Sequence, residues 1–140
     1  MAHLSVTRRY RFCAAHRLHT DYLTPEENLS AFGKCNNPNG HGHNYVVLVT
    51  IRGGKERRSF ALERLDRAVE DTIIARFDHQ DLNSDPEFAH LTTTGENLVK
   101  LIWDLLAAKI PPGCLEKVGV VETRDNYFEY AAPAALHERT

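Results

Sequence analysis

The feature that most constrains this chain is a pair of segments in which alternate residues are mostly apolar. The first runs from Leu4 to His16, and its even positions are Leu, Val, Arg, Tyr, Phe, Ala and His. The second runs from His43 to Arg52, and its odd positions are His, Tyr, Val, Val and Ile. A period of two is typical of β-strands with one buried face. The sequence therefore predicts two strands whose apolar faces carry His16 and His43.

Histidines gather at one end of these two predicted strands. The segment His41-Gly42-His43 leads into the second strand, and residues two apart in a strand point to the same face. If the strands pair antiparallel, His16 can reach both histidines. Three neutral imidazoles with an open fourth position form the ligand set of a catalytic zinc ion. We interpret His16, His41 and His43 as a zinc site; the alternative is a chance His-x-His pair and a packed core histidine.

The remaining histidines lack such a setting. We interpret His3, His19, His90 and His137 as surface residues, with His19 as the main alternative to His16 as a ligand. His79 differs because it follows Asp78, and a carboxylate can orient an imidazole for proton transfer. Many Asp-His pairs are only polar groups of a turn, so both interpretations of this pair stay open.

Cys35 lies six residues before His41 in a segment rich in glycine and asparagine. A cysteine close to a metal ion or an imidazole can have a lowered pKa and react as a thiolate. Cys35 could instead be a fourth ligand that closes a structural zinc site, or an inert buried thiol. We interpret Cys13 and Cys114 as inert buried thiols.

The second half of the chain predicts two helices and two further strands. Apolar residues at helical spacing predict a helix from Leu62 to Arg76 and another that follows the capping-box pattern Thr93-x-x-Glu96 and ends before Pro111-Pro112. Strands are predicted at 115–122 and 127–130. Glu122 shares a face with apolar residues of its strand, where it could bind an amide-rich ring or form a salt bridge. Glu96 could be only a helix cap.

This order of elements predicts an α+β fold. Two hairpins separated by two helices (ββααββ) suit a four-stranded antiparallel sheet with both helices on one face. Such a sheet has two bare edges, and pairing with copies of the same chain would cover them. We expect a long functional loop over residues 17–40, a polar turn over 53–58 and a loose tail over 131–140.

The length and composition of the chain limit the classes of function that it can have. With 140 residues we expect one domain over residues 1–140, and the net charge of −2 does not indicate a nucleic-acid or membrane partner. No apolar run approaches the roughly 20 residues of a membrane span, and we recognise no signal peptide. Three cysteines are too few for a disulfide framework, which predicts a reducing, cytoplasmic setting.

Several segments together resemble the 6-pyruvoyl-tetrahydropterin synthase family. They lie in the family's order and span nearly the whole chain: 12–18, 33–45, 77–83, 94–98 with Ile102-Trp103, and 121–123. The most specific is Cys35-x5-His41-Gly42-His43. The resemblance implies a tunnelling fold, in which sheets of several subunits pair into a β-barrel. It also implies trimers that stack into hexamers, with active sites at the subunit interfaces.

The same resemblance implies a site and a reaction. Zinc is expected on the three histidines, and the substrate is 7,8-dihydroneopterin triphosphate, which loses triphosphate while its side-chain hydroxyls become ketones. Cys35 would be the general base, and Asp78 with His79 the partner proton relay from a neighbouring subunit. Glu122 would anchor the pterin ring, in a pocket lined by Glu96, Thr93 and Thr94.

Two other functions remain possible at this point. The first is 6-carboxytetrahydropterin synthase of queuosine biosynthesis, which uses the same substrate and zinc but releases acetaldehyde. Its cysteine usually lies nearer the His-Gly-His, typically as Cys-x3, so the Cys-x5 spacing here favours the pyruvoyl type. The second is a non-catalytic zinc-binding oligomer in which Cys35 closes the coordination shell. The chain departs from the family pattern at Gln80, where Lys is frequent, and at Gly95, where a second Thr is frequent. The residues that bind the triphosphate are not predicted.

Overall fold

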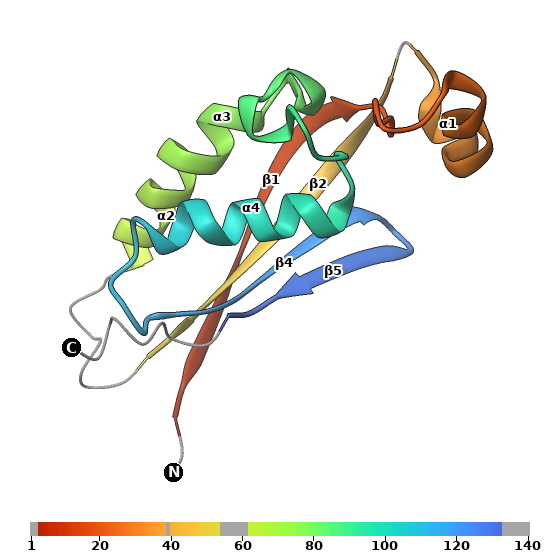
Figure 1. The fold of residues 1–140 in the computed structure, drawn as a ribbon. Helices are drawn as coiled ribbons and strands as arrows, with labels where there is room; N and C mark the ends of the chain where they lie inside the picture. Colours follow the sequence, from red (N-terminus) through yellow and green to blue (C-terminus); the bar gives the residue numbers. More distant parts are fainter. Residues whose placement is uncertain (1–2, 39, 54–61, 133–140) are drawn as a thin grey trace.

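A twisted five-stranded sheet organises the computed structural model, which describes residues 3–38, 40–53 and 62–132 (Figure 1). The strand order is β3-β1-β2-β4-β5. The strands are β1 (Ser5–His16), β2 (His41–Arg52), β3 (Gln80–Asp81), β4 (Leu115–Thr123) and β5 (Asn126–Tyr130).

The two long strands β1 and β2 pair antiparallel along their whole length. The register joins Phe12 to Tyr45 and His16 to His41. Side chains from even positions of β1 and odd positions of β2 point to the same face, which is the buried one. Both predicted strands are confirmed, and β2 begins two residues earlier than predicted because its pairing with β1 continues to His41.

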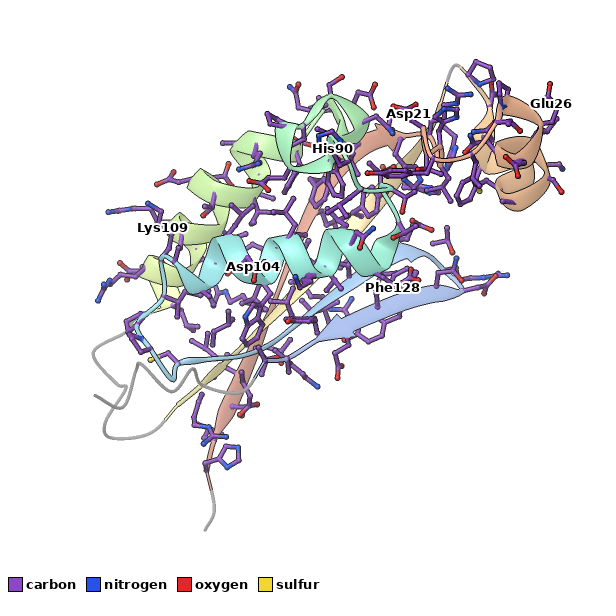
Figure 2. All side chains as sticks on the ribbon, in the orientation of Figure 1. Asp21, Glu26, His90, Asp104, Lys109 and Phe128 are labelled. Carbon is purple, nitrogen blue, oxygen red and sulfur yellow. The ribbon has the colours of Figure 1, made fainter. Side chains whose placement is uncertain are left out.

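The main helices cover one face of the sheet, as predicted (Figure 1). The first is continuous through α2 (Leu62–Val69), a π-helical segment η3 (Glu70–Ile74) and α3 (Ala75–Phe77). The second is α4 (Gly95–Ala107). Figure 2 shows side chains filling the space between these helices and the sheet. The core between the layers includes Phe12, Tyr45, Val47, Leu65, Phe77, Leu98, Ile102 and Leu106.

The prediction of a four-stranded, wholly antiparallel sheet is wrong in one respect. A fifth strand, β3, pairs parallel with the end of β1 through Ala14–Gln80 and Ala15–Asp81. Two residues are too short a run to show alternation. Short 3-10 turns follow it, η4 (Leu82–Ser84) and η5 (Pro86–Phe88).

The segment predicted as a loop over 17–40 contains a helix, α1 (Pro25–Phe32), and a 3-10 turn, η1 (Gly33–Asn36). Thr24 caps α1 and forms a reciprocal capping box with Glu27, while Pro25 occupies the first turn. Figure 1 shows α1 beyond the end of β1 and β2, away from the other helices.

The helix cap predicted at Thr93 lies at Thr94. The Thr94 hydroxyl accepts a hydrogen bond from Asn97 N, while the Thr93 hydroxyl donates to the carbonyl of Arg17 at 3.2 Å. Thr93 is therefore used in a tertiary contact instead of a cap. The polar turn predicted over 53–58 lies, except for Gly53, outside the described residues, as does most of the predicted tail. Within the described part of the chain, no helix is long and apolar enough to span a membrane.

Candidate active site

Three histidine rings meet at the end of the β1–β2 pair. The ring centroids lie 4.4 Å apart for His16 and His41, 4.9 Å for His16 and His43, and 4.8 Å for His41 and His43. One nitrogen from each ring lies within 4.8 Å of the others. The antiparallel register brings these residues together, as the alternation predicted.

The bonding of His16 suits a metal ligand. Its Nδ1–H donates to the carbonyl oxygen of Thr93 at 2.7 Å, so Nε2 of the neutral ring keeps its lone pair. That Nε2 lies 3.1 Å from Nε2 of His43. In a tetrahedral zinc site with Zn–N bonds of about 2.0–2.1 Å, two ligand nitrogens lie about 3.3 Å apart. The spacing therefore fits a shared zinc ion.

Burial keeps two of these imidazoles neutral. Desolvation lowers the pKa of His16, and the neighbouring His41 and His43 lower it further, although the Thr93 carbonyl and Glu122 act in the opposite direction. Desolvation also lowers the pKa of His43. Neutral imidazole is the form that binds a metal, so both rings are ready to act as ligands near neutral pH.

Cys35 is not part of the group of ligand atoms. Among the described residues, the metal-binding group consists of the three histidines and includes no cysteine or carboxylate. Cys35 is half-buried in η1, where its carbonyl oxygen accepts a hydrogen bond from Leu18 N at 2.7 Å. This hydrogen bond holds the cysteine segment against the residues that follow β1.

Glu122 borders the histidine group from the next strand. Its Oε2 lies 3.9 Å from Nε2 of His16, and its side chain is 14% exposed. A carboxylate that is nearly buried yet open to solvent at this point can accept hydrogen bonds from a ligand's N–H groups. The structure thus brings together Glu122 and the three histidines, which come from segments far apart in the sequence.

Asp78 and His79 are held at the edge of the sheet by the backbone of Cys13. Asp78 Oδ1 accepts from Cys13 N at 2.9 Å, and His79 N donates to Cys13 O at 2.6 Å. His79 has a φ of 59°, and its side chain is 79% exposed. Its Nε2 lies 3.6 Å from Asp78 Oδ2. The imidazole therefore faces outward beside its carboxylate, next to a cavity of about 470 Å³ that Cys13 and Asn44 also line. The prediction that Cys13 is buried is wrong, because its side chain lies on the exposed face of β1, whereas Cys114 is buried as predicted.

The other residues predicted to line the ring pocket are Thr93, Thr94 and Glu96, and the structure places them in different surroundings. Thr93 is fully buried and its carbonyl contacts His16, so it belongs to the histidine site. Thr94 is the cap of α4. Glu96 lies exposed in the first turn of α4, where no contact with the histidine group is found among the described residues.

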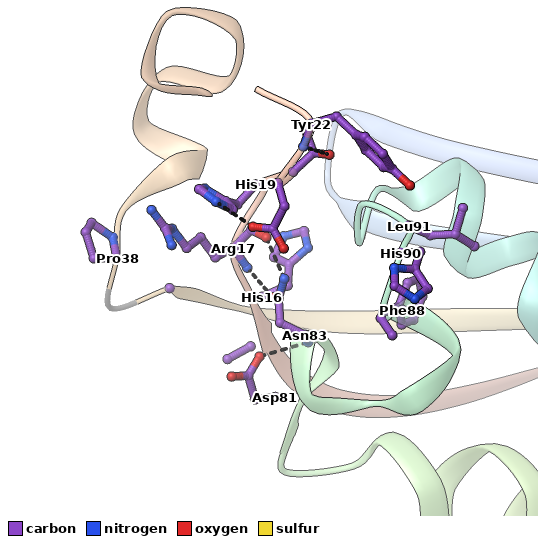
Figure 3. A pocket seen from close by; sticks show the side chains of 15 residues that line it. His16, Arg17, His19, Tyr22, Pro38, Asp81, Asn83, Phe88, His90 and Leu91 are labelled. Atoms are coloured by element: carbon purple, nitrogen blue, oxygen red, sulfur yellow. Dashed lines mark hydrogen bonds and ion pairs between the residues drawn. The ribbon is translucent and has the colours of Figure 1, made fainter. Parts of the chain in front are cut away.

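A larger cavity of about 570 Å³ opens beside His16 (Figure 3). Figure 3 shows Arg17 and His19 on one side and Phe88, His90 and Leu91 on the other. Arg17 was not predicted from the sequence. Its Nε donates to the carbonyl of Asn36 at 2.9 Å, which connects the end of β1 to the Cys35 segment.

Asn36 is a second residue that sequence reasoning did not single out. Its side-chain nitrogen donates to the carbonyl of Leu18 at 2.7 Å and lies 3.1 Å from Nδ1 of His19. The only signal for it was its place in the asparagine-rich segment before the histidines. His19 takes part in this network and not in the metal-binding group.

Comparison with known proteins shows the family of this chain. The family model of 6-pyruvoyl tetrahydropterin synthase matches residues 5–133. The chain belongs to this family. The match contains both long strands, all three histidines and Glu122.

Individual relatives extend the family match over most of the chain. The 6-pyruvoyl tetrahydrobiopterin synthase of Homo sapiens is 46% identical over 129 residues, covering 89% of each chain. The Drosophila melanogaster protein of the same name is 43% identical and covers 94% of this chain and 82% of its own. The structure of Caenorhabditis elegans 6-pyruvoyl tetrahydropterin synthase superposes with a TM-score of 0.87 at 35% identity, covering 95% of this chain and 98% of that one. The family's fold and lyase class are thus those of this chain.

Proposed function

We propose that this protein is a zinc-dependent 6-pyruvoyl tetrahydropterin synthase that eliminates triphosphate from 7,8-dihydroneopterin triphosphate with rearrangement of the side chain. The observation that carries the proposal is the histidine group at the end of the β1–β2 pair, with His16 oriented by Thr93. Membership of the family supplies the reaction type.

His16, His41 and His43 would hold the metal ion through neutral imidazoles. A zinc ion bound there acts as a Lewis acid that acidifies C–H bonds next to the substrate's hydroxyl groups. The Thr93 carbonyl keeps Nε2 of His16 directed at the site, and the absence of a fourth ligand from the described residues leaves room for those hydroxyls.

Cys35 is proposed as the base that moves protons on the substrate side chain. Its segment is tethered to the strand that carries His16, through Leu18 N and through Arg17. Asp78 and His79 are proposed as the partner relay of an adjacent subunit. In support, the His79 ring points to solvent at the sheet edge and not into the histidine group of its own chain.

Glu122 is proposed to anchor the pterin ring. Its carboxylate borders the histidine group and remains partly exposed, so N–H groups of the ring can reach it. Thr93 and Thr94 are proposed to line the ring pocket. Glu96 keeps its proposed place there only if a bound ring or a neighbouring subunit reaches the first turn of α4.

The sheet supports a proposed oligomer. Among the described strands, β5 is one edge of the sheet, and β1 has a neighbour on its outer side only where β3 pairs with Ala14 and Ala15. Edges with unpaired backbone groups are suited to pairing with another copy. We propose a barrel of several subunits and a hexamer built from two trimers, in a cytoplasmic setting consistent with three free thiols.

Two observations weigh against the alternative functions. The relatives named above, at 43–46% identity, are pyruvoyl and not carboxy enzymes. A closed structural zinc site is disfavoured because Cys35 lies outside the ligand group.

Product analysis tests the proposal. The zinc-loaded protein is incubated with 7,8-dihydroneopterin triphosphate, and the products are identified by mass spectrometry. A pyruvoyl pterin with free triphosphate supports the proposal. A carboxy pterin with acetaldehyde assigns the chain to the queuosine reaction. Zinc binding without turnover contradicts the catalytic proposal.

A further inference from the structure

The Tyr45 side chain is a polar group that the proposed mechanism does not use. It lies on β2, two residues after His43, and is fully buried. Its ring stacks on Phe12 with a centroid distance of 5.0 Å and contacts the His43 ring edge-on at 5.5 Å. Its hydroxyl is the one buried side-chain oxygen or nitrogen among the described residues that has no hydrogen-bond partner.

An unpartnered buried hydroxyl costs free energy, because it gives up its hydrogen bonds to water and gains none. Packing alone does not explain its presence. The stacking on Phe12 uses the aromatic ring, which phenylalanine would supply equally well. The hydroxyl therefore points to a role that appears only when another group arrives.

Glu122 is a carboxylate on the neighbouring strand whose charge reaches this hydroxyl: burial, and after it the Glu122 charge, raises the pKa of Tyr45. The register of β2 and β4 joins Val46 to Val121 and Val47 to Val120. Tyr45 and Glu122 are the next positions on the two strands, and by alternation both point to the inward face. The Glu122 carboxylate and the Tyr45 hydroxyl differ in how accessible they are to a ligand. The Glu122 side chain is partly exposed, whereas the Tyr45 hydroxyl is enclosed, so a ligand reaches the carboxylate and not the phenol.

We propose that Tyr45 is a positioning residue whose hydroxyl donates a hydrogen bond to Glu122 when the pterin ring engages that carboxylate. The inference rests on the proposed function, since it deepens the role of Glu122 there. The side of the carboxylate that faces the cavity accepts from the ring, and the side that faces the core accepts from Tyr45. A carboxylate held from both sides binds a planar ring in one orientation.

The test is Tyr45→Phe. We expect KM for 7,8-dihydroneopterin triphosphate to rise about tenfold while kcat stays within about twofold, because ring binding contributes equally to the ground state and the transition state. We expect the melting temperature of the ligand-free variant to be equal to or higher than that of the parent, since no hydrogen bond is lost. An unchanged KM, or a melting temperature clearly below the parent's, overturns the proposal.

Tyr10→Phe is the matched control. Tyr10 lies on β1 and its hydroxyl donates to Asp66 at 2.7 Å, away from the histidine group. Removing that partnered hydroxyl should lower the melting temperature and leave KM unchanged, which is the reverse of the result expected for Tyr45.

A double variant tests whether Tyr45 acts through Glu122. In a Glu122→Gln background, Tyr45→Phe should weaken binding no further; an additional tenfold loss overturns the proposal. If the parent shows no turnover, the proposed function fails separately. Fluorescence titration with 7,8-dihydroneopterin then decides the role of Tyr45: about tenfold weaker binding to Tyr45→Phe supports it, and equal or no binding overturns it.

Discussion

The Nδ1–H of His16 donates a 2.7 Å hydrogen bond to the carbonyl oxygen of Thr93, joining the end of β1 to the residue before the cap of α4. Both residues are buried. Because the acceptor is a backbone oxygen, the tautomer and the orientation of His16 do not depend on the Thr93 side chain. The orientation of the His16 ring is therefore set by how the helix layer packs on the sheet.

His41→Ala should remove zinc without unfolding the protein. His41 is half-buried and contributes little to the core, whereas two remaining imidazoles bind zinc far more weakly than three. Metal content per subunit, measured by elemental analysis after dialysis, should fall to near zero. His90→Ala, which alters a histidine outside the ligand group, should retain full zinc. Full zinc in His41→Ala would contradict the assignment.

Cys35→Ala and His79→Ala should each keep zinc and lower turnover by about 10²–10⁴-fold, the range for a lost acid or base. Neither residue is in the ligand group. If His79 serves the site of a neighbouring subunit, oligomers reassembled from the two variants should regain part of the activity. Each inactive variant alone, taken through the same unfolding and refolding, is the control. No recovery in oligomers shown to be mixed would indicate that Cys35 and His79 act within one chain.

Gly95→Ala should destabilise the protein, because a Cβ at Gly95 would overlap the ring of Phe128. Overpacking of this kind costs about 1–3 kcal/mol. In a Phe128→Ala background the same change should cost much less, which urea denaturation of the four proteins would show. Gly42→Ala is the control for stability, since its Cβ would lie 3.8 Å from the Ala14 carbonyl, an ordinary contact. Additive losses at Gly95 and Phe128 would be evidence against the steric explanation.

Asp85 should stabilise the fold in a manner that depends on pH. Arg76 donates to both of its carboxylate oxygens at 2.8 Å, and this hydrogen bonding lowers the pKa of Asp85. The unfolded chain then binds more protons than the folded one, so the contribution is complete above the ordinary pKa of about 3.9 and is lost as the pH falls through the folded value. Asp85→Asn should cost about 1–3 kcal/mol at neutral pH.

Urea denaturation of Asp85→Asn and its parent at several pH values checks this dependence. The difference in unfolding free energy between them should shrink as the pH falls below about 4. A constant difference across that range would show that the carboxylate charge is not responsible. Asn at this position can still accept the hydrogen bond that Glu87 N donates to Asp85, so the local turn is preserved in the comparison.

The parts of the fold that follow from alternation were predictable. His16 lies on the buried face because Phe12 and Ala14 precede it at even positions. An antiparallel pair was expected to bring His16 near His41 and His43, but the register that pairs His16 with His41 was not predicted. The inward direction of Glu122 was predictable for the same reason as that of His16, because Val118, Val120 and Glu122 are alternate residues of one strand and point to the same face.

Features that depend on polar or backbone contacts, and not on a pattern of apolar residues, were not predicted. Helix α1 buries only one residue, Asn28, whose side chain bonds to the carbonyls of Thr20, Leu23 and Thr24, so it shows no apolar stripe. Its capping box from Thr24 to Glu27 was the available signal. The conformation of His79, with its positive φ, is imposed by contacts with Cys13 that no local pattern shows.

The pairing of β1 with β2 has a consequence for how this chain can change in length. His16 and the core residue Phe12 occupy positions of the same parity on one strand, so insertion of a single residue between them would turn His16 to the opposite face of the sheet. Such an insertion would remove a proposed metal ligand even if the hydrophobic core formed intact. Only changes by two residues would keep both. Apart from such changes by two residues, the length of β1 between Phe12 and His16 is thus fixed for any variant of this chain that keeps His16 in the histidine group, whereas the connections beyond the paired strands carry no such restriction.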